Sequence, residues 1–423
     1  MFDRFFKMPR TVTRQENGPW VEERRRYLAH CAALQMKCCS LQQIATYTLM
    51  IAQTLRLAER PEAMVTLTEI EAGADRCVWL LNRRRQSGRS KTLKGDGLRN
   101  NFRWHATRWL KFLGRLQMPT PGPRPYANLV TEFRDYMLRE RGLAPSTIAA
   151  RSHTLQAFLG EIDEAGLSLS RLTVAQVNDL LVKKVHEHNY ARRTIKSWAT
   201  AIREFLRFAE RRGHCQRGMA DGIKSPHLYR HEGLPIGPSW DDVKRLLAAT
   251  EGDCPIDIRN RAMLMLLAVY GLRGGEVTAL RLEDFDWKQE LLRVPLGKRM
   301  KPRAYPLCRS VGDAVLRYLR EVRPRTHHRR IFLITVAPFS PMTDSALRSV
   351  VSFRLHALGL TLPHYGTHML RHACASHLLS QGHSLKEIGD HLGHQSPQST
   401  RIYAKVDLVA LRKVGDFGLE GVL

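Results

Sequence analysis

The chain has 423 residues, 43% of them hydrophobic, which suits roughly two to four folded domains and argues against a disordered protein. Lys and Arg number 67 against 40 Asp and Glu, so the net charge is +27. This excess is spread along the whole chain. It favours an extended polyanion such as nucleic acid as the partner, although an inert basic surface would give the same composition.

Membrane insertion and secretion are not expected from the sequence. The longest apolar stretch, residues 262–270, has the length of a buried helix and falls short of the roughly 20 residues of a membrane span. The first ten residues lack the apolar core and cleavage site of a signal peptide. The eight cysteines are scattered without metal-binding spacing, so we expect reduced thiols in the cytoplasm and no metal site.

Two stretches rich in Pro and Gly predict linkers, residues 119–125 and 233–238. They divide the chain into three segments, 1–118, 126–232 and 236–423. The first two segments resemble each other, because residues 20–28 parallel 129–138 and residues 104–113 parallel 198–208. We interpret this as a tandem duplication of one small helical module, with chance similarity between amphipathic helices as the alternative.

The second segment shows four helical patterns. Apolar residues recur at helical spacing over 129–137, and further helices are expected over 145–159, after Thr173, and over 195–212. Ser146 or Thr147 is the expected cap of the second helix. Basic side chains suited to phosphate contact cluster around the start of the last helix and along it: Arg192, Arg193, Lys196 and Arg203. For each of them singly, a solvated helix face is the competing interpretation.

The third segment begins with a helix that Ser239 can cap, followed by the apolar helix 262–270, which ends at Gly271. Residues 291–307 predict two strands around a polar turn, and the remainder is helical. The sequence therefore predicts a mainly α fold with a small β-sheet.

Six residues of this segment suggest a common chemistry. Arg273 directly follows the buried helix, and Lys298 lies in the turn between the two strands. His368 and Arg371 are three apart, so they share one helix face. His394 lies just past a helix that ends at Gly393. Tyr403 follows nine residues later, on a short helix that Ser399 or Thr400 can cap.

This set of side chains suits phosphoryl transfer without a metal. Arginines bind non-bridging phosphate oxygens and neutralise the charge of the transition state. A tyrosine hydroxyl can attack phosphorus and hold the strand covalently. A lysine can protonate the departing sugar oxygen, while a histidine accepts the proton of the nucleophile or binds the phosphate. Each residue alone also fits packing or a surface pair, so the specific signal is the ordered set.

The last 170 or so residues resemble the catalytic domain of the tyrosine site-specific recombinase (phage integrase) family. The resemblance rests on the motifs G-L-R-x-x-E at Arg273, H-x-x-R at His368 and Arg371, and L-G-H at His394, together with Lys298 in its turn and Tyr403 after S-T-x-x. It implies that these six residues are catalytic. Gly274-Gly275 departs from the usual branched and small pair and is expected to loosen that helix start.

The resemblance also implies what spacing cannot show. Segment 126–232 is similar to the helical core-binding (SAM-like) domain of the family, which closes with the catalytic domain around double-stranded DNA. Two protomers would occupy a recombination site and four would meet in synapsis, with other recombinases or DNA-bending proteins as further partners. A 3′-phosphotyrosine intermediate requires neither ATP nor a metal, so no cofactor is expected. The tail 406–423 resembles a helix that docks on a neighbouring protomer, or else caps its own chain.

Several functions stay open at this point. Integration, excision or transposition of a mobile element is the leading hypothesis, acting in the cytoplasm on the nucleoid. A chromosome or plasmid dimer resolvase would use the same chemistry, as would a type IB topoisomerase. A non-catalytic, architectural DNA-binding subunit is the alternative of another class. Residues 1–118 would bind arm DNA, the outer part of the same site, or a partner.

Overall fold

The structure is a computed structural model that describes residues 1–60, 62, 64–85, 95–118, 126–227, 237–294, 303–394 and 396–403. The chain divides into two compact units, Met1–Met118 with Gly233–Leu423, and Pro119–Glu232. Buried hydrophobic side chains form separate clusters over the N-terminal helices, the middle unit and the C-terminal segment. No described helix combines the length and the apolar character that crossing a bilayer requires.

The N-terminal helices surround a core that contains Phe102 and Trp109. Helix α3 packs against α2, α4 and α5. A two-residue parallel pairing joins β1 (Val65–Thr66) to β2 (Leu116–Gln117). The helices and turns of this part are η1 (Phe2–Arg4), α1 (Pro9–Glu16), α2 (Val21–Ala33), α3 (Cys38–Thr54), η2 (Leu57–Glu59), α4 (Leu67–Arg85) and α5 (Gly95–Phe112).

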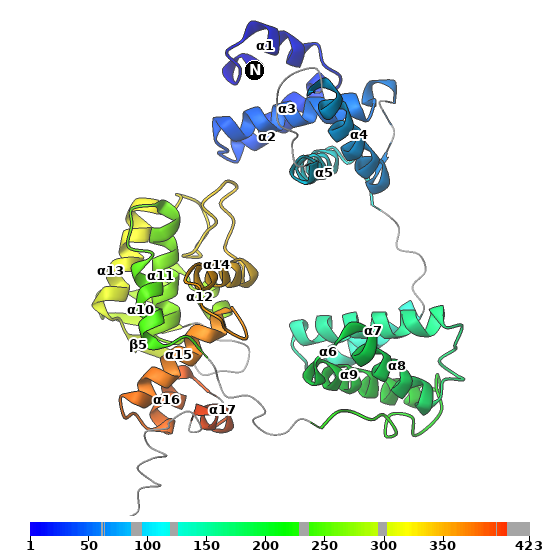
Figure 1. Cartoon of the computed structure of the whole chain (residues 1–423), viewed down its shortest axis with the longest axis vertical. Coiled ribbons are helices and arrows are strands. Elements are labelled where there is room, and N and C mark those ends of the chain that lie inside the picture. Colours follow the sequence, from blue (N-terminus) through cyan, green and yellow to red (C-terminus); the bar gives the residue numbers. More distant parts are fainter. Residues whose placement is uncertain are drawn as a thin grey trace, which may run out of the picture. The chain divides into compact units, whose positions relative to one another are not determined.

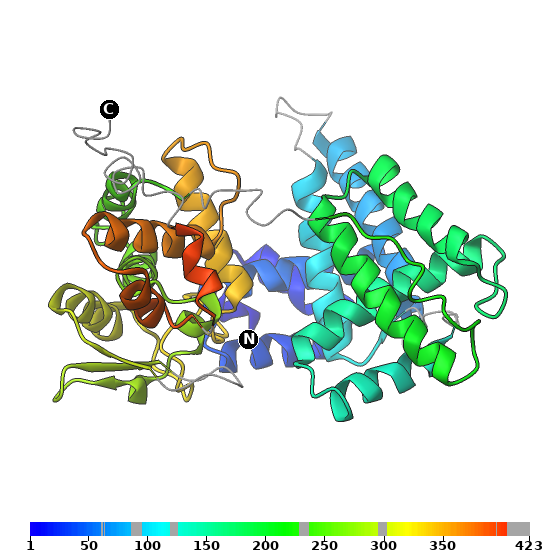
Figure 2. The same cartoon turned by 90° about the horizontal axis from the view of Figure 1, so that it is seen from below.

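The described residues of the middle unit, 126–227, form four helices, drawn from cyan to green in Figures 1 and 2: α6 (Ala127–Arg139), α7 (Pro145–Glu164), α8 (Val174–His188) and α9 (Arg192–Arg211). Helix α9 packs against the other three, with Phe133, Phe205 and Phe208 at the centre. Thr173 caps α8 as expected. The expected cap of α7 is wrong, because that helix already begins at Pro145 and has no side-chain cap.

The four helices α2 to α5 correspond, one by one in chain order, to the four helices α6 to α9. Both sets begin after an aromatic residue with left-handed backbone, Trp20 (φ 54°) and Tyr126 (φ 59°). In both sets the second helix contacts the first and the fourth. The tandem duplication stays a prediction, and these are the features that the two sets of helices share.

The C-terminal segment is built around α11, whose apolar residues are nearly all buried. This helix begins at Pro255, earlier than the sequence pattern indicated. The predicted strand pair is confirmed as β4 and β5 of an antiparallel sheet ordered β3-β4-β5, in which Leu292 lies opposite Tyr305. Ser239 caps α10 with a capping box, as predicted.

The elements of this segment are α10 (Trp240–Ala248), α11 (Pro255–Val269), α12 (Gly274–Ala279), η3 (Leu282–Asp284), β3 (Phe285–Asp286), β4 (Leu291–Val294), β5 (Arg303–Pro306), α13 (Arg309–Arg317), the π-helical turn η4 (Tyr318–Val322), α14 (Asp344–Ala357), α15 (Thr367–Ser380), α16 (Leu385–Leu392) and α17 (Gln398–Arg401). Mainly helical structure with small sheets is thus confirmed.

Close packing brings the ends of α11 and α16 together. Gly271 follows α11 with φ +57°, and a Cβ atom there would lie 2.4 Å from Leu392 Cδ2. Gly393 ends α16 in the left-handed conformation, as its place in the L-G-H motif predicts. The turns that precede Arg273 and His394 therefore lie next to each other.

Candidate active site

Arg273 is the N-terminal cap of α12 and is oriented by Glu276, one turn further on. The backbone N–H of Arg273 donates to Glu276 Oε2 (2.8 Å), and its guanidinium donates to Glu276 Oε1 (2.9 Å). The side chain of Arg273 is 39% exposed. One carboxylate thus fixes both the backbone and the side chain of this arginine, and leaves its guanidinium accessible to a ligand.

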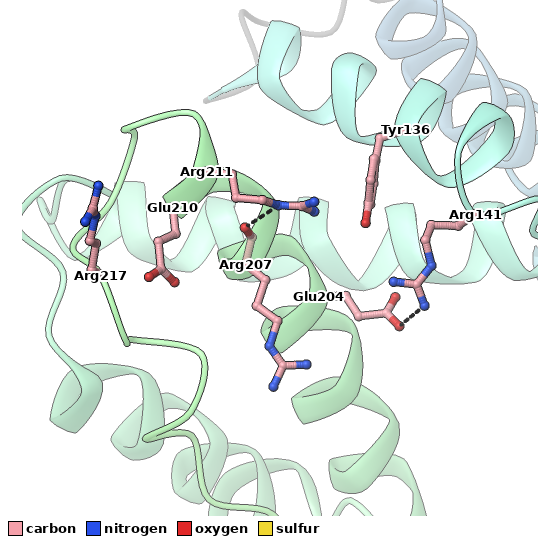
Figure 3. Close-up of a pocket in the computed structure, with 7 residues that line it drawn as sticks. All are labelled: Tyr136, Arg141, Glu204, Arg207, Glu210, Arg211 and Arg217. Carbon is pink, nitrogen blue, oxygen red and sulfur yellow. Dashed lines mark hydrogen bonds and ion pairs between the residues drawn. The ribbon is translucent and has the colours of Figure 1, made fainter.

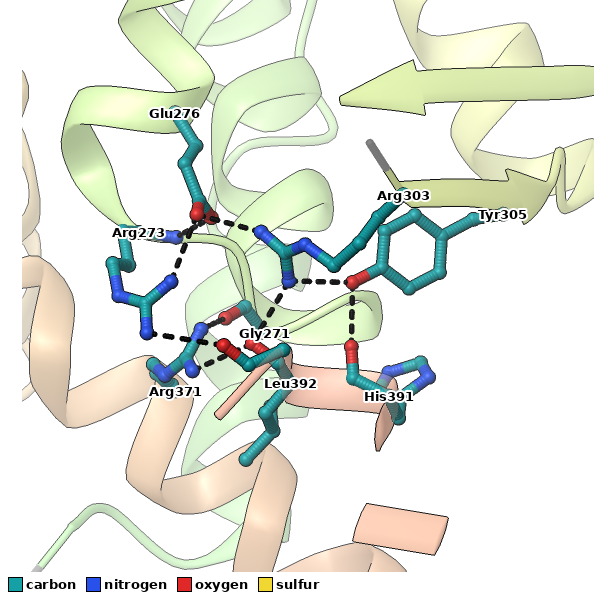
Figure 4. Close-up of polar contacts among 9 residues, drawn as sticks. Gly271, Arg273, Glu276, Arg303, Tyr305, Arg371, His391 and Leu392 are labelled. Carbon is teal, nitrogen blue, oxygen red and sulfur yellow. Dashed lines mark hydrogen bonds and ion pairs between the residues drawn. The ribbon is translucent and has the colours of Figure 1, made fainter. Parts of the chain in front are cut away.

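Glu276 also binds Arg303, which reaches it from β5 at 2.6 Å (Figure 4). Burial opposes the charged form of Glu276. Its pKa is nevertheless lowered, because the backbone N–H of Arg273 and the charges of Arg303 and Arg273 stabilise the carboxylate. Sequence reasoning missed Arg303, since 27 positions separate it from Glu276 and only the return of the β-hairpin brings them together.

Arg371 lies on α15 and is 1% exposed. Its guanidinium donates to the carbonyl oxygens of Gly271 (2.6 Å) and Leu392 (2.7 Å), and the Leu392 oxygen also accepts from Arg303 at 2.8 Å (Figure 4). Burial and the nearby Arg273 lower the pKa of Arg371 to about 10, so it remains charged at neutral pH. Arg273 and Arg371 are therefore held beside each other. Among these contacts the carboxylate of Glu276 pairs with Arg273, and carbonyl oxygens hold Arg371, so the two arginines and Glu276 together keep a net positive charge.

His368 and His394 lie near the arginines. Partial burial and the charges of Arg371 and Arg273 lower the pKa of His368, whose side chain is exposed one turn before Arg371. His394 follows Gly393, and its Nδ1 lies 2.7 Å from Thr400 Oγ1. The same causes lower the pKa of His394 to about 4. Both rings are thus neutral at physiological pH, able to donate one hydrogen bond each.

Tyr403 is 1% exposed and packs in an apolar cluster with Cys374, Ile388 and Leu392. Burial raises the pKa of its hydroxyl to about 12. The hydroxyl lies 2.9 Å from Nδ1 of His372, a residue that sequence reasoning missed. A short helix, α17, is present as predicted, but it ends at Arg401, so Tyr403 lies just beyond it and not on it. The helix begins after Pro397, so the expected cap by Ser399 or Thr400 is wrong.

The structure brings five of the six predicted residues into one region. Each comes from a different turn or helix, except for His368 and Arg371, which share one face of α15. Lys298 lies outside the described residues, as does the predicted tail helix 406–423.

Gly274 has a packing role that the sequence did not indicate. A Cβ atom there would lie 2.3 Å from Asp344 Oδ1 and 2.9 Å from Thr367 Oγ1. Glycine therefore permits the close approach of α12 to the starts of α14 and α15. Gly275, by contrast, faces open space.

Two basic hollows lie on the middle unit. The first, of about 540 Å³ between α7 and α9, is lined by Arg193 and Lys196 together with the hydroxyl residues Ser146, Thr147 and Thr200. Arg192 is the exposed first residue of α9. Arg203 is half-buried and donates to the Ile223 carbonyl at 2.8 Å, so it serves the packing of the unit.

The second hollow, of about 690 Å³, has the ring of Tyr136 on one side (Figure 3). Hydrogen bonds from Arg211 and Arg141 lower the pKa of the Tyr136 hydroxyl. The hollow is lined by four arginines and two glutamates: Arg141, Glu204, Arg207, Glu210, Arg211 and Arg217. Its net positive charge suits an anionic ligand.

Family comparisons match both of the last two segments. The profile of the phage integrase family matches residues 239–408, and that of the phage integrase N-terminal SAM-like domain matches residues 130–213. A relative from Sinorhizobium fredii, "Putative integrase/recombinase y4rA", is 35% identical over 392 residues, covering 84% of this chain and 94% of its own. The chain belongs to the phage integrase family of tyrosine recombinases. It is therefore an enzyme of DNA cleavage and rejoining.

Further comparisons agree with this assignment. "Tyrosine recombinase XerD" from Pseudomonas aeruginosa is 32% identical over 282 residues, covering 66% of this chain and 92% of its own. Among solved structures, XerH site-specific recombinase bound to palindromic difH substrate superposes with a TM-score of 0.55 at 20% identity, covering 68% of this chain and 84% of that one. The fold predicted from the family resemblance is thereby confirmed.

Proposed function

We propose that this recombinase serves a mobile genetic element, cutting and rejoining DNA through a 3′-phosphotyrosine intermediate on Tyr403. The observation that carries the proposal is the meeting of two arginines, two histidines and a tyrosine from separate elements of one domain. No single local motif brings these five side chains together. As a set they provide the anion-binding groups and the nucleophile that phosphoryl transfer requires.

The chemistry of these side chains and the family resemblance support the following roles. Arg273 and Arg371 bind the non-bridging oxygens of the scissile phosphate and stabilise its additional charge in the transition state. His368 and His394 donate hydrogen bonds to the same group. The Tyr403 hydroxyl attacks phosphorus, and Lys298 protonates the departing sugar oxygen. Because Tyr403 is 1% exposed, DNA binding has to uncover its hydroxyl first.

The mobile-element role is supported by the extent of similarity to the integrase/recombinase of S. fredii. A match over 84% of this chain is longer than segments 126–232 and 236–423 together, so it extends into residues 1–118. The XerD relative covers 66% of the chain. A chromosome or plasmid dimer resolvase of the same chemistry is the alternative.

DNA binding is assigned to the basic side of the middle unit, with Arg192, Arg193 and Lys196 at the start of α9. Segments 1–118, 126–232 and 236–423 act as separate modules, the first on DNA outside the core site. Two protomers occupy a site and four form the synapse, in the cytoplasm on the nucleoid. Phosphate contacts of this kind fix position without reading sequence.

The test of cleavage uses nicked duplexes of 40 base pairs that tile the DNA on both sides of the gene. A nick close to the cut lets the short product leave and traps the covalent adduct. We expect a band resistant to denaturation on at least one duplex, and none with Tyr403→Phe. Failure of every tiled duplex, or an adduct that survives Tyr403→Phe, would contradict the proposal. Adducts at both element ends favour the mobile-element role over dimer resolution.

The DNA-binding assignment has its own test. Replacing Arg193 and Lys196 by alanine removes two phosphate contacts, so the slope of log affinity against log salt should fall by about 2. Arg309, 96% exposed on the catalytic segment, provides the control substitution Arg309→Ala. An unchanged slope in the double variant would place the DNA on another surface.

A further inference from the structure

His372 lies directly after Arg371 on α15, outside the six residues discussed above. Its Nδ1 is 2.9 Å from the Tyr403 hydroxyl, and their ring centroids are 5.6 Å apart. His372 is 9% exposed and Tyr403 is 1% exposed, so water competes little for this hydrogen bond. A buried hydrogen bond to the nucleophilic oxygen itself needs an explanation.

The other histidines of the site are placed for different contacts. The exposed ring of His368 packs edge-on against His372, with centroids 4.4 Å apart. His394 contacts Thr400 through Nδ1. Within the part of the chain that the structure describes, His372 is the histidine whose ring nitrogen meets the Tyr403 hydroxyl. The sequence predicted a histidine that accepts this proton or binds the phosphate, and His372 was not among the candidates.

The electrostatic surroundings keep His372 available as an acceptor. The charged and titratable groups that face it are His368 and Arg371 from α15, Tyr403 from the segment after α17, and His394 from the turn after α16. Burial, then His368 and Arg371, lower the pKa of His372 to about 4. The ring is therefore neutral at physiological pH, and a tautomer with its proton on Nε2 leaves Nδ1 free to accept from Tyr403.

A bound phosphate would strengthen this base. The phosphate brings negative charge to Arg273 and Arg371, which offsets the positive charge that disfavours protonation of His372. The pKa of Tyr403 lies far above that of His372, so the proton has to move as the bond to phosphorus forms rather than before it.

We propose that His372 is a further catalytic residue, the general base that takes the proton of Tyr403 during attack; this rests on the proposed function. The Tyr403 oxygen forms a bond to phosphorus while its proton passes to Nδ1 of His372. The bond from phosphorus to the departing sugar oxygen breaks, and that oxygen takes its proton from Lys298. In religation the proton returns from His372 to Tyr403.

The experiment measures single-turnover adduct formation between pH 5.5 and 9 on a nicked flanking duplex that the wild type cleaves. His372→Asn retains an acceptor oxygen near the position of Nδ1 but cannot take the proton. We expect its rate to fall about 10²–10³-fold, with DNA affinity within twofold of wild type. The acidic limb of the wild-type pH profile, which reports protonation of the base, should disappear.

A second substrate distinguishes the role of the general base, His372, from that of the general acid, Lys298. Sulfur in place of the departing sugar oxygen leaves without protonation, because a thiol is far more acidic than an alcohol. This substrate should rescue Lys298→Ala and should not rescue His372→Asn. His377, which stacks on Trp240 at the far end of α15, provides the matched control His377→Asn, expected to cleave like wild type.

Three outcomes would overturn the proposal. If His372→Asn forms the adduct at a rate within threefold of wild type, His372 is not the general base. A faster rate would show that the hydrogen bond from Tyr403 to His372 holds the tyrosine in an inactive position. An acidic limb that persists in the variant would assign the titration to another group. If His372→Asn loses DNA binding, His372→Gln is measured in its place. A wild type without adduct on any duplex contradicts the proposed function instead.

Discussion

The arginine side and the tyrosine side of the candidate active site are stabilised in different ways. Arg273, Arg303 and Arg371 are fixed by Glu276 and by backbone carbonyls, in a polar network open to solvent at Arg273. Tyr403 is fixed by apolar packing and by one hydrogen bond to His372. The comparison indicates that the arginine side is held by polar contacts, whereas the proposed nucleophile is held in an apolar cluster and is buried.

The largest expected effect is the loss of DNA cleavage when Tyr403 is replaced, with little change in the stability of the fold. Tyr403→Phe should abolish the adduct, yet lower the free energy of unfolding by only about 1 kcal/mol, since it removes one hydrogen bond and keeps the ring. Urea unfolding followed by circular dichroism measures the second quantity. A loss of several kcal/mol would show that the hydroxyl is structural.

On the arginine side, one substitution should damage stability and chemistry together. Glu276→Gln leaves two guanidinium groups beside an uncharged, largely buried amide, and we expect a loss of about 3 kcal/mol in unfolding free energy with slower cleavage. Asp286→Asn is the control, because Asp286 pairs with the half-exposed Arg293. Equal losses in the two variants would contradict the special role of Glu276.

Acid should weaken the tyrosine side. The pKa of His372 is about 4 in the folded chain and near 6.5 when unfolded, so between these values the unfolded chain binds more protons. Stability is therefore lost as pH falls from 6.5 to 4, by about 2 kcal/mol for this ring. The pH dependence of unfolding should be shallower in His372→Asn. Identical slopes would show that His372 stays solvated.

The last prediction concerns the turn that connects the two sides, where the informative quantity is a small difference between two variants. Gly393→Ala combines a left-handed backbone (φ +64°) with a Cβ atom 2.5 Å from Arg303 Nη1. We expect a loss of about 2 kcal/mol and slower cleavage. Gly382→Ala is matched in backbone (φ +88°) and faces open space. The unfolding midpoint of Gly382→Ala should therefore fall by less than that of Gly393→Ala. An equal fall in the two variants would show that the contact with Arg303 does not contribute to the loss of stability.

Local signals in the sequence were sufficient for much of the fold. Ser239 and Thr173 are caps because their motifs need no distant partner, and the antiparallel pairing of β4 with β5 follows from an equally local pattern. The α16 end at Gly393 follows from the conformational freedom of glycine. The family and the mainly helical fold were identified from the same kind of short motifs.

Contacts between distant elements could not be predicted in this way. The partnership of Glu276 with Arg303 depends on the return of β5, and that of His372 with Tyr403 on the packing of the last helix turn. His372 was discoverable in part, since it lies one helical turn after His368. The burial of Tyr403 had no signal in its own sequence neighbourhood, because the cluster around it comes from α15 and α16.

The carbonyl oxygen of Leu392 has a consequence for the order in which the protein becomes active during synthesis. It accepts hydrogen bonds from Arg303 and Arg371, which the ribosome makes 89 and 21 residues earlier. Until that oxygen has emerged, Arg303 and Arg371 lack one of their hydrogen-bond acceptors. The arginine network is thus completed only after α16 has been made, and the proposed nucleophile Tyr403 follows later still.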